Sequence, residues 1–187
     1  LFYSTKVTLY FLTLTFSVLI SSCGGGGNSS LNEPLPPPDP QPTTPPTPEI
    51  PLSERKYITQ TIDGQQVERT YLIRYPEEIS KSSYPVVFFF HGAGGNGQGW
   101  FNNHPEVENL IDQEQFIGIF PDGYDNRWNV GTETNADDVE FITLIVNDFG
   151  ANELFNTEKI YGVGTSNGAG LANKIGKETS LFKGIAP

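Results

Sequence analysis

The amino-acid sequence predicts an α/β fold with a mostly parallel β-sheet. Continuous apolar runs, rich in aromatic and β-branched residues, occur at residues 86–90, 116–120 and 160–163. Such runs are typical of strands that are buried on both faces. Helical patterns separate them, and strands that alternate with helices indicate parallel pairing.

Two further strands are expected before this alternating part. Residues 57–62 and 67–75 have the composition of strands, and Asp63-Gly64 lies between them. Because an Asp-Gly pair favours the tight turn of a β-hairpin, we expect the two strands to pair antiparallel.

Helices are expected between the apolar strands. Residues 106–113 give a short helical pattern, and residues 136–149 give a stronger one with apolar side chains at helical spacing. Asn135 is the predicted N-cap of the second helix. Asp137 and Asp138 are then explained by the positive end of the helix dipole, without a metal or acid-pair role.

Composition excludes several classes of function. The chain has 187 residues, 22 acidic and 11 basic, and a formal net charge of -11. This acidity argues against binding to nucleic acid or to an anionic membrane surface. A single Cys excludes an internal disulfide framework and a multi-Cys metal site, and two His leave few candidates for a general base. The sequence contains no Met, which indicates an irregular or missing start.

The N-terminal residues 1–53 have the organisation expected of an exported protein. Residues 1–22 resemble a signal peptide, and Ile20-Ser21-Ser22-Cys23 resembles a bacterial lipobox, so Cys23 is the expected lipidation site. A plain secretory signal with an incidental Cys is the alternative. Residues 23–53 form a Gly-rich and then Pro-rich linker, and residues 54–187 form the expected catalytic region.

The most specific motif is the G-x-S-x-G pentapeptide from Gly164 to Gly168. An apolar strand precedes it and a helical stretch follows it, which is the context of a nucleophile elbow. Ser166 is then the expected nucleophile. Gly164 and Gly168 are needed because larger side chains would collide with the neighbouring strand and helix at this tight turn. An ordinary Gly-rich turn is the alternative.

A second Gly-rich loop, His91-Gly92-Ala93-Gly94-Gly95, directly follows the strand at residues 86–90. In this position such a loop supplies one backbone N–H of an oxyanion hole, and Asn167 supplies the other. Ala93 is the expected donor, with Gly94 as the next choice. We expect His91 and Gly92 to support the loop. The catalytic His of α/β-hydrolases follows the nucleophile in chain order, whereas His91 precedes Ser166. The loop lacks the ending of a phosphate-binding P-loop.

A third loop follows the strand at residues 116–120 and contains Pro121-Asp122-Gly123. Because loops at the carboxyl ends of parallel strands line the active cleft, Trp128 and Tyr124 are candidate substrate contacts. Packing within the core is the alternative for Trp128.

These motifs together resemble the polyhydroxybutyrate depolymerase and feruloyl esterase group of secreted α/β-hydrolases. The resemblance covers residues 55–187 and rests on the order of the segments 68–71, 85–95, 121–123, 137–141 and 159–168. It implies an α/β-hydrolase fold with helices on both faces of the sheet. It also implies a serine esterase that acts through an acyl-enzyme on polyesters or ester-decorated polysaccharide, without metal or organic cofactor.

One departure from the group concerns the catalytic Asp and His, which the group places after the nucleophile. Residues 169–187 contain neither, and His104 lies upstream in a loop. The expectation is therefore a C-terminally truncated enzyme whose sheet is incomplete and which is inactive as written, because serine needs a base.

Two other functions remain open, and the expected binding partners are few. The chain could be a non-catalytic polysaccharide-binding module on the same scaffold, or a related serine peptidase or thioesterase. The expected partner is a polymeric or small ester substrate, with no nucleic acid and membrane contact only through lipid on Cys23. The expected location is an outer-membrane or cell-surface lipoprotein, or otherwise the extracellular space.

Overall fold

The computed structural model describes residues 51–150 and 152–187. The predicted signal peptide, Cys23 and nearly all of the predicted linker lie outside these residues. Within the described ranges, no helix has the length and apolarity that a membrane span would need.

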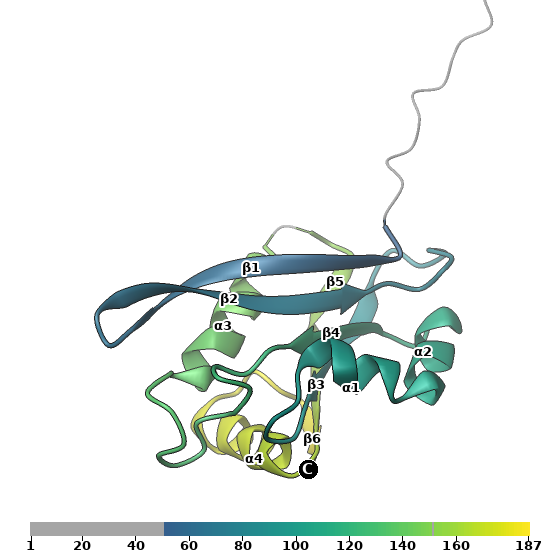
Figure 1. Cartoon of the computed structure of the whole chain (residues 1–187). Helices are drawn as coiled ribbons and strands as arrows, with labels where there is room; N and C mark the ends of the chain where they lie inside the picture. The colour runs from purple at the N-terminus through teal and green to yellow at the C-terminus, as the bar shows by residue number, and fades with distance from the viewer. Residues whose placement is uncertain (1–50, 151) are drawn as a thin grey trace, which may run out of the picture. The chain divides into compact units, whose positions relative to one another are not determined.

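A mixed six-stranded sheet forms the centre of the fold, in the order β1-β2-β4-β3-β5-β6 (Figure 1). Strands β4, β3, β5 and β6 are parallel to one another, whereas β2 pairs antiparallel with both β1 and β4. The α/β class predicted from the sequence is therefore confirmed. The strands are β1 (Ser53–Ile62), β2 (Gln65–Arg74), β3 (Tyr84–Phe90), β4 (Ile117–Pro121), β5 (Phe155–Gly164) and β6 (Gly184–Ala186).

The predicted hairpin forms between β1 and β2, with Ile62 opposite Gln65. Its turn residues, Asp63 and Gly64, both have positive φ, at 50° and 75°. Two central residues of positive φ are what the favoured two-residue hairpin turn requires, which explains why Asp-Gly stands here. The hairpin is seen as the long pair of arrows labelled β1 and β2 in Figure 1.

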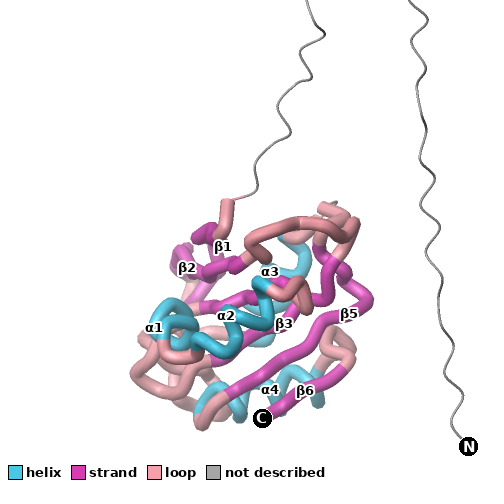
Figure 2. The backbone as a smooth tube through the Cα atoms, turned by 90° about the vertical axis from the view of Figure 1, so that its right-hand side faces the viewer, coloured by secondary structure: helices cyan, strands magenta, loops and turns pink. Residues whose placement is uncertain are grey.

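Four helices fill the connections between the parallel strands. Helices α1 (Gly97–Asn102) and α2 (Pro105–Asp112) connect β3 to β4, α3 (Asp138–Asp148) connects β4 to β5, and α4 (Asn167–Glu178) connects β5 to β6. The core accordingly has two apolar clusters. One contains buried residues of α3 and α4, and the other contains buried residues of α1 and α2. Figure 2 shows these helices around the strands.

Two details differ from the sequence prediction. Helix α3 is capped by Asp137, whose side chain accepts a hydrogen bond from the Glu140 N–H at 2.9 Å, so the prediction of Asn135 as N-cap is wrong. Asn135 instead donates to the Asp63 carboxylate at 2.8 Å. Helix α1 was not predicted, because its sequence GQGWFN has two glycines and no helical periodicity. The signal for it is Asn96, which accepts a hydrogen bond from the Gly99 N–H at 2.7 Å as N-cap.

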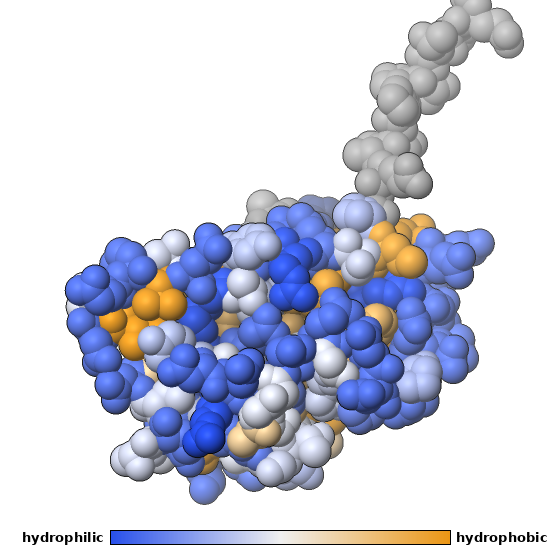
Figure 3. Space-filling model, viewed as in Figure 1, coloured by the Kyte–Doolittle hydropathy of each residue, from blue (hydrophilic) through white to orange (hydrophobic). Residues whose placement is uncertain are grey.

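The face of the domain seen in Figure 3 is mostly hydrophilic, with small separate hydrophobic areas. This agrees with the acidic composition and with the burial of the aromatic side chains of β3, among them Phe88, Phe89 and Phe90.

Candidate active site

The G-x-S-x-G segment forms a tight turn between β5 and α4. Ser166 stands directly before α4, with φ 55° and ψ -115°. Positive φ is strained for a residue with a side chain, and such strain concentrates at functional sites. Ser166 is exposed, and its side chain makes no capping hydrogen bond to α4. The hydroxyl is therefore presented to solvent above the end of the sheet.

The two glycines of the segment are required by close backbone contacts. A Cβ on Gly164 would lie 2.3 Å from the Gly168 carbonyl oxygen. A Cβ on Gly168 would lie 2.3 Å from the Phe90 oxygen and 2.6 Å from the His91 oxygen. These distances are far below any real carbon–oxygen contact, so α4 can approach β3 and β5 this closely only because both positions lack a side chain.

The Gly-rich loop at residues 91–95 lies beside Ser166. A Cβ added to Gly92 would be 3.6 Å from the Ser166 Cβ and 3.5 Å from the Thr165 oxygen. Pairing of β3 with β5 produces this contact, because the Thr165 N–H donates to the Phe90 carbonyl at 3.1 Å at the ends of both strands. The topology thus brings together two motifs that are more than seventy positions apart in the sequence.

Two backbone N–H groups at this place are available for a ligand. Gly94 donates to Asn126 at 2.8 Å and Gly95 donates to Gly92 at 3.1 Å, whereas among the described residues the Ala93 N–H has no partner. Asn167 is the first residue of α4, and the first N–H groups of a helix have no partner within the helix. Of the two loop donors considered from the sequence, Ala93 is therefore the free one and Gly94 is engaged.

His91 is a buried support of the loop. Its Nδ1 lies 2.8 Å from the Gly92 oxygen and its Nε2 accepts a hydrogen bond from the Gly123 N–H at 3.0 Å. Burial lowers the pKa of His91 below its usual value, although the Gly92 bond and the charges of Asp122 and Asp138 oppose this shift. A neutral ring with one N–H and one free lone pair matches both contacts. Since both ring nitrogens are occupied, this His has no free nitrogen to take a proton from Ser166.

Trp128, a candidate substrate contact from the sequence, is buried in the core. Its side chain is 0% exposed and packs edge-on against Phe90, with 5.6 Å between ring centroids. The indole Nε1 donates to the His91 carbonyl at 2.8 Å. Packing within the core, the alternative weighed from the sequence, is what the structure shows. Tyr124 is half-buried beside Arg69 and lines a shallow cavity of about 200 Å³.

A larger cavity, of about 380 Å³, opens on the loop at residues 91–95 and was not predicted from the sequence. Its other wall comes from α1 and the residue that caps α2, with Trp100 and His104 stacked at 3.7 Å between ring centroids. His104 bonds through Nδ1 to the Trp100 oxygen at 2.6 Å. If that nitrogen carries the proton, Nε2 is left as an acceptor. His104 and Asn103 are among the polar side chains here that could contact a bound molecule.

A buried ion pair anchors the loop after β4. Arg69 of β2 contacts Asp138 of α3 at 2.7 Å, with the two side chains 3% and 0% exposed. The second Asp138 oxygen accepts the Asn129 N–H at 2.6 Å, and Gln60 accepts from Arg69 at 2.7 Å. The sequence explained Asp138 by the helix dipole alone. Its buried cationic partner, Arg69 on β2, could not be seen from sequence spacing.

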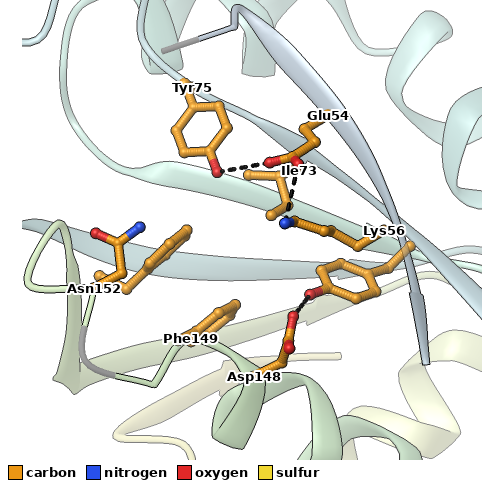
Figure 4. A pocket seen from close by; sticks show the side chains of 9 residues that line it. Glu54, Lys56, Ile73, Tyr75, Asp148, Phe149 and Asn152 are labelled. Atoms are coloured by element: carbon orange, nitrogen blue, oxygen red, sulfur yellow. Dashed lines mark hydrogen bonds and ion pairs between the residues drawn. The ribbon is translucent and has the colours of Figure 1, made fainter. Parts of the chain in front are cut away.

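A further cavity, of about 100 Å³, lies between the β1–β2 hairpin and the end of α3 (Figure 4). Its polar groups satisfy one another. The Tyr71 hydroxyl donates to Asp148 at 2.7 Å and the Tyr75 hydroxyl to Glu54 at 3.5 Å, while Lys56 pairs with Glu54 at 3.0 Å. Burial raises the pKa of both tyrosines, so both hydroxyls remain donors at neutral pH. No cluster of metal-ligating side chains occurs in the part of the chain that the structure describes.

Comparison with known proteins supports this description of the fold. No protein-family model matches the chain. An acetylxylan esterase of Coprinopsis cinerea is 27% identical over 139 residues, which cover 70% of this chain and 37% of that protein. An acetyl xylan esterase from Aspergillus awamori has a similar structure, with a TM-score of 0.55 and 19% identity over 71% of this chain and 50% of that one.

Other similar structures are also esterases. A ferulic acid esterase gives a TM-score of 0.52 at 15% identity, covering 71% of this chain and 57% of that chain. A thermostable esterase gives 0.52 at 19% identity, covering 70% and 40%. The chain thus spans between about a third and three fifths of the length of these relatives. The fold is that of the α/β-hydrolase esterases, as the sequence predicted.

Proposed function

We propose that this chain carries the nucleophile and oxyanion hole of a serine esterase that cleaves carboxylic esters on a polymer. The observation that carries the proposal is the strained, exposed Ser166 beside two free backbone N–H groups. Fixed donors aimed at a developing oxyanion are usually the largest single contribution to catalysis of acyl transfer.

The proposed reaction has two stages. The Ser166 oxygen attacks the ester carbonyl carbon, its proton passes to a base, and the carbonyl oxygen becomes an oxyanion that Ala93 and Asn167 bind. As this intermediate collapses, the protonated base returns its proton to the leaving oxygen, so that the alcohol departs and an acyl-enzyme remains. Water then gives a proton to the base and attacks the acyl carbon, and collapse of the second intermediate releases the acid and returns the proton to Ser166.

The base and its orienting acid are proposed to come from chain that follows Pro187. Both ring nitrogens of His91 are engaged, and His104 precedes Ser166 in the chain, whereas the catalytic His of α/β-hydrolases follows the nucleophile. The similar Coprinopsis cinerea protein is much longer than the matched region, which covers 37% of it. The proposal therefore includes that residues 1–187 alone do not catalyse.

A polysaccharide ester is the proposed substrate. The supporting observation is that similar proteins are named acetylxylan esterase and ferulic acid esterase. Within the broader group suggested by the motifs, this favours an ester-decorated polysaccharide over a polyhydroxyalkanoate. The cavity beside residues 91–95, with His104 and Asn103 on its wall, is the proposed place of the bound substrate. Tyr124 remains a second, more distant candidate contact.

The proposal is tested with the gene product that includes the coding sequence downstream of Pro187. We expect hydrolysis of p-nitrophenyl acetate and release of acetate or ferulate from decorated xylan. Ser166→Ala is expected to lower kcat about 10⁴-fold or more, as for other serine hydrolases. Ser82→Ala, at an exposed serine, is the matched control and should leave kcat unchanged. Activity that survives Ser166→Ala would contradict the proposal.

Export and lipid anchoring through Cys23 are proposed from the sequence of residues 1–23. Cells expressing the chain should incorporate labelled palmitate into it, and Cys23→Ala should abolish the incorporation. Equal labelling of both forms, or of neither, would overturn the anchor and leave a plain secretory signal.

A further inference from the structure

The loop after β4 connects the two halves of the oxyanion hole. Residues 122–128 form this loop, here called the bracket loop. On one side, Asn167 receives the Trp128 N–H on its side-chain oxygen at 2.7 Å and donates its amide to the Trp128 carbonyl at 3.0 Å. One side chain thus satisfies both backbone groups of Trp128, so it fixes the position of that residue relative to α4.

On its other side, the bracket loop holds the loop at residues 91–95 at three points. The Trp128 indole donates to the His91 carbonyl at 2.8 Å, and the Gly123 N–H donates to the His91 ring at 3.0 Å. The Asn126 carbonyl accepts the Gly94 N–H at 2.8 Å. The free N–H of Ala93 is therefore flanked by groups that are tied to the bracket loop.

We propose that Asn167, through its side chain, and Trp128 act as positioning residues that set the spacing between the Ala93 and Asn167 N–H groups. The observation that carries this is the continuous chain of contacts from the Asn167 amide through Trp128 to the His91 carbonyl. The indole is buried and both polar atoms of the Asn167 side chain are bonded to Trp128, so both residues act through the backbone donors. This proposal rests on the proposed function, because it assumes that an oxyanion forms at Ser166.

Misplacement of the donors should affect catalysis more than binding. An interaction that is stronger in the transition state than in the ground state lowers kcat and kcat/KM together when it is lost, with KM unchanged. A displacement of about 1 Å at a catalytic group can lower the rate about 10²-fold. Loss of fold stability alone would instead reduce the amount of active enzyme without changing kcat per folded molecule.

The test uses the esterase that includes the sequence downstream of Pro187, with p-nitrophenyl acetate as substrate. Trp128→Phe keeps an aromatic ring in the core and removes the indole N–H. Asn167→Ala removes both contacts to Trp128, and Asn167→Asp keeps the acceptor but loses the donor. We expect each variant to lower kcat about 10- to 100-fold with KM within twofold of the wild type. Asn173→Ala, at an exposed asparagine of the same helix, should leave kcat unchanged.

The double variant Asn167→Ala/Trp128→Phe separates one network from two independent effects. If both residues act on the same spacing, it should be no more than about threefold worse than the more impaired single variant. Multiplication of the two single effects, or wild-type kcat in folded Trp128→Phe and Asn167→Asp, would overturn the proposal. Thermal unfolding of every variant measures how much of each protein is folded. Ser166→Ala in the same assay distinguishes this failure from that of the proposed function, which falls only if Ser166→Ala stays active.

Discussion

Polar groups are arranged in opposite ways at two places in the domain, the hairpin cavity and the surroundings of Ser166. In the cavity between the β1–β2 hairpin and the end of α3, tyrosine hydroxyls, carboxylates and a lysine satisfy one another on regular backbone. Beside Ser166, backbone N–H groups are left free and the backbone itself is strained. Free donors on a strained turn are available for chemistry, whereas mutually bonded groups stabilise the fold. The comparison therefore supports the proposed catalytic role of the Ser166 end and a packing role of the hairpin end.

After Ser166→Ala itself, the largest effect on activity is expected from Gly168→Ala, which disturbs the backbone around Ser166. The new methyl would lie 2.3 Å from the Phe90 oxygen, and backbone cannot move aside cheaply. We expect at least a 100-fold loss of esterase activity and destabilisation of about 1–3 kcal/mol from overpacking. Gly176→Ala in the same helix is the control, since its nearest neighbour is the tip of the Ile185 side chain at 3.1 Å. Normal activity in folded Gly168→Ala would show that the close approach is unnecessary.

The buried ion pair should give a large effect on stability. Asp138→Ala leaves Arg69 without its counter-charge in a site where the two side chains are 3% and 0% exposed. Removal of one partner from such a pair costs about 3–5 kcal/mol. Urea unfolding measures this loss, and Asp138→Asn, which keeps an acceptor oxygen, provides a milder variant if the first does not fold. Glu158→Ala, in an exposed pair with Lys183, should change little. Equal small effects in Asp138→Ala and Glu158→Ala would contradict the anchoring role.

The smallest effect is expected at the hairpin cavity. Tyr71→Phe removes one hydrogen bond, to the exposed Asp148, and should cost about 0.5–1.5 kcal/mol of unfolding free energy. Esterase activity should remain at the wild-type level, because the hydroxyl that is removed bonds to Asp148, at the end of α3, and not to the residues beside Ser166. A fall in kcat of tenfold or more would mean that the hairpin cavity takes part in the reaction after all.

The fold was predictable because the apolar runs of β3 and β4 and the Asp63-Gly64 turn are local signals. The elbow at Ser166 was also predictable, since its glycines report a backbone constraint that few other residues satisfy. The buried contact partners of Trp128 and of Asp138 were not predictable from the sequence. Whether Trp128 faces substrate or core depends on Asn167 and His91, which lie far from it in the sequence. Nor does sequence spacing reveal that Arg69 meets Asp138 across the sheet. Long-range polar contacts of this kind arise only when the strands have paired.

The conformation of Ser166 also has a consequence for engineering. A side chain at φ 55° and ψ -115° costs the folded state about 1–3 kcal/mol, a cost that glycine at the same position would avoid. Selection for thermostability alone would thus favour replacement of Ser166, the proposed nucleophile, and selection for turnover would restore it. The two demands oppose each other at one residue, so screens for robust variants of this domain need to measure activity and unfolding on the same clones.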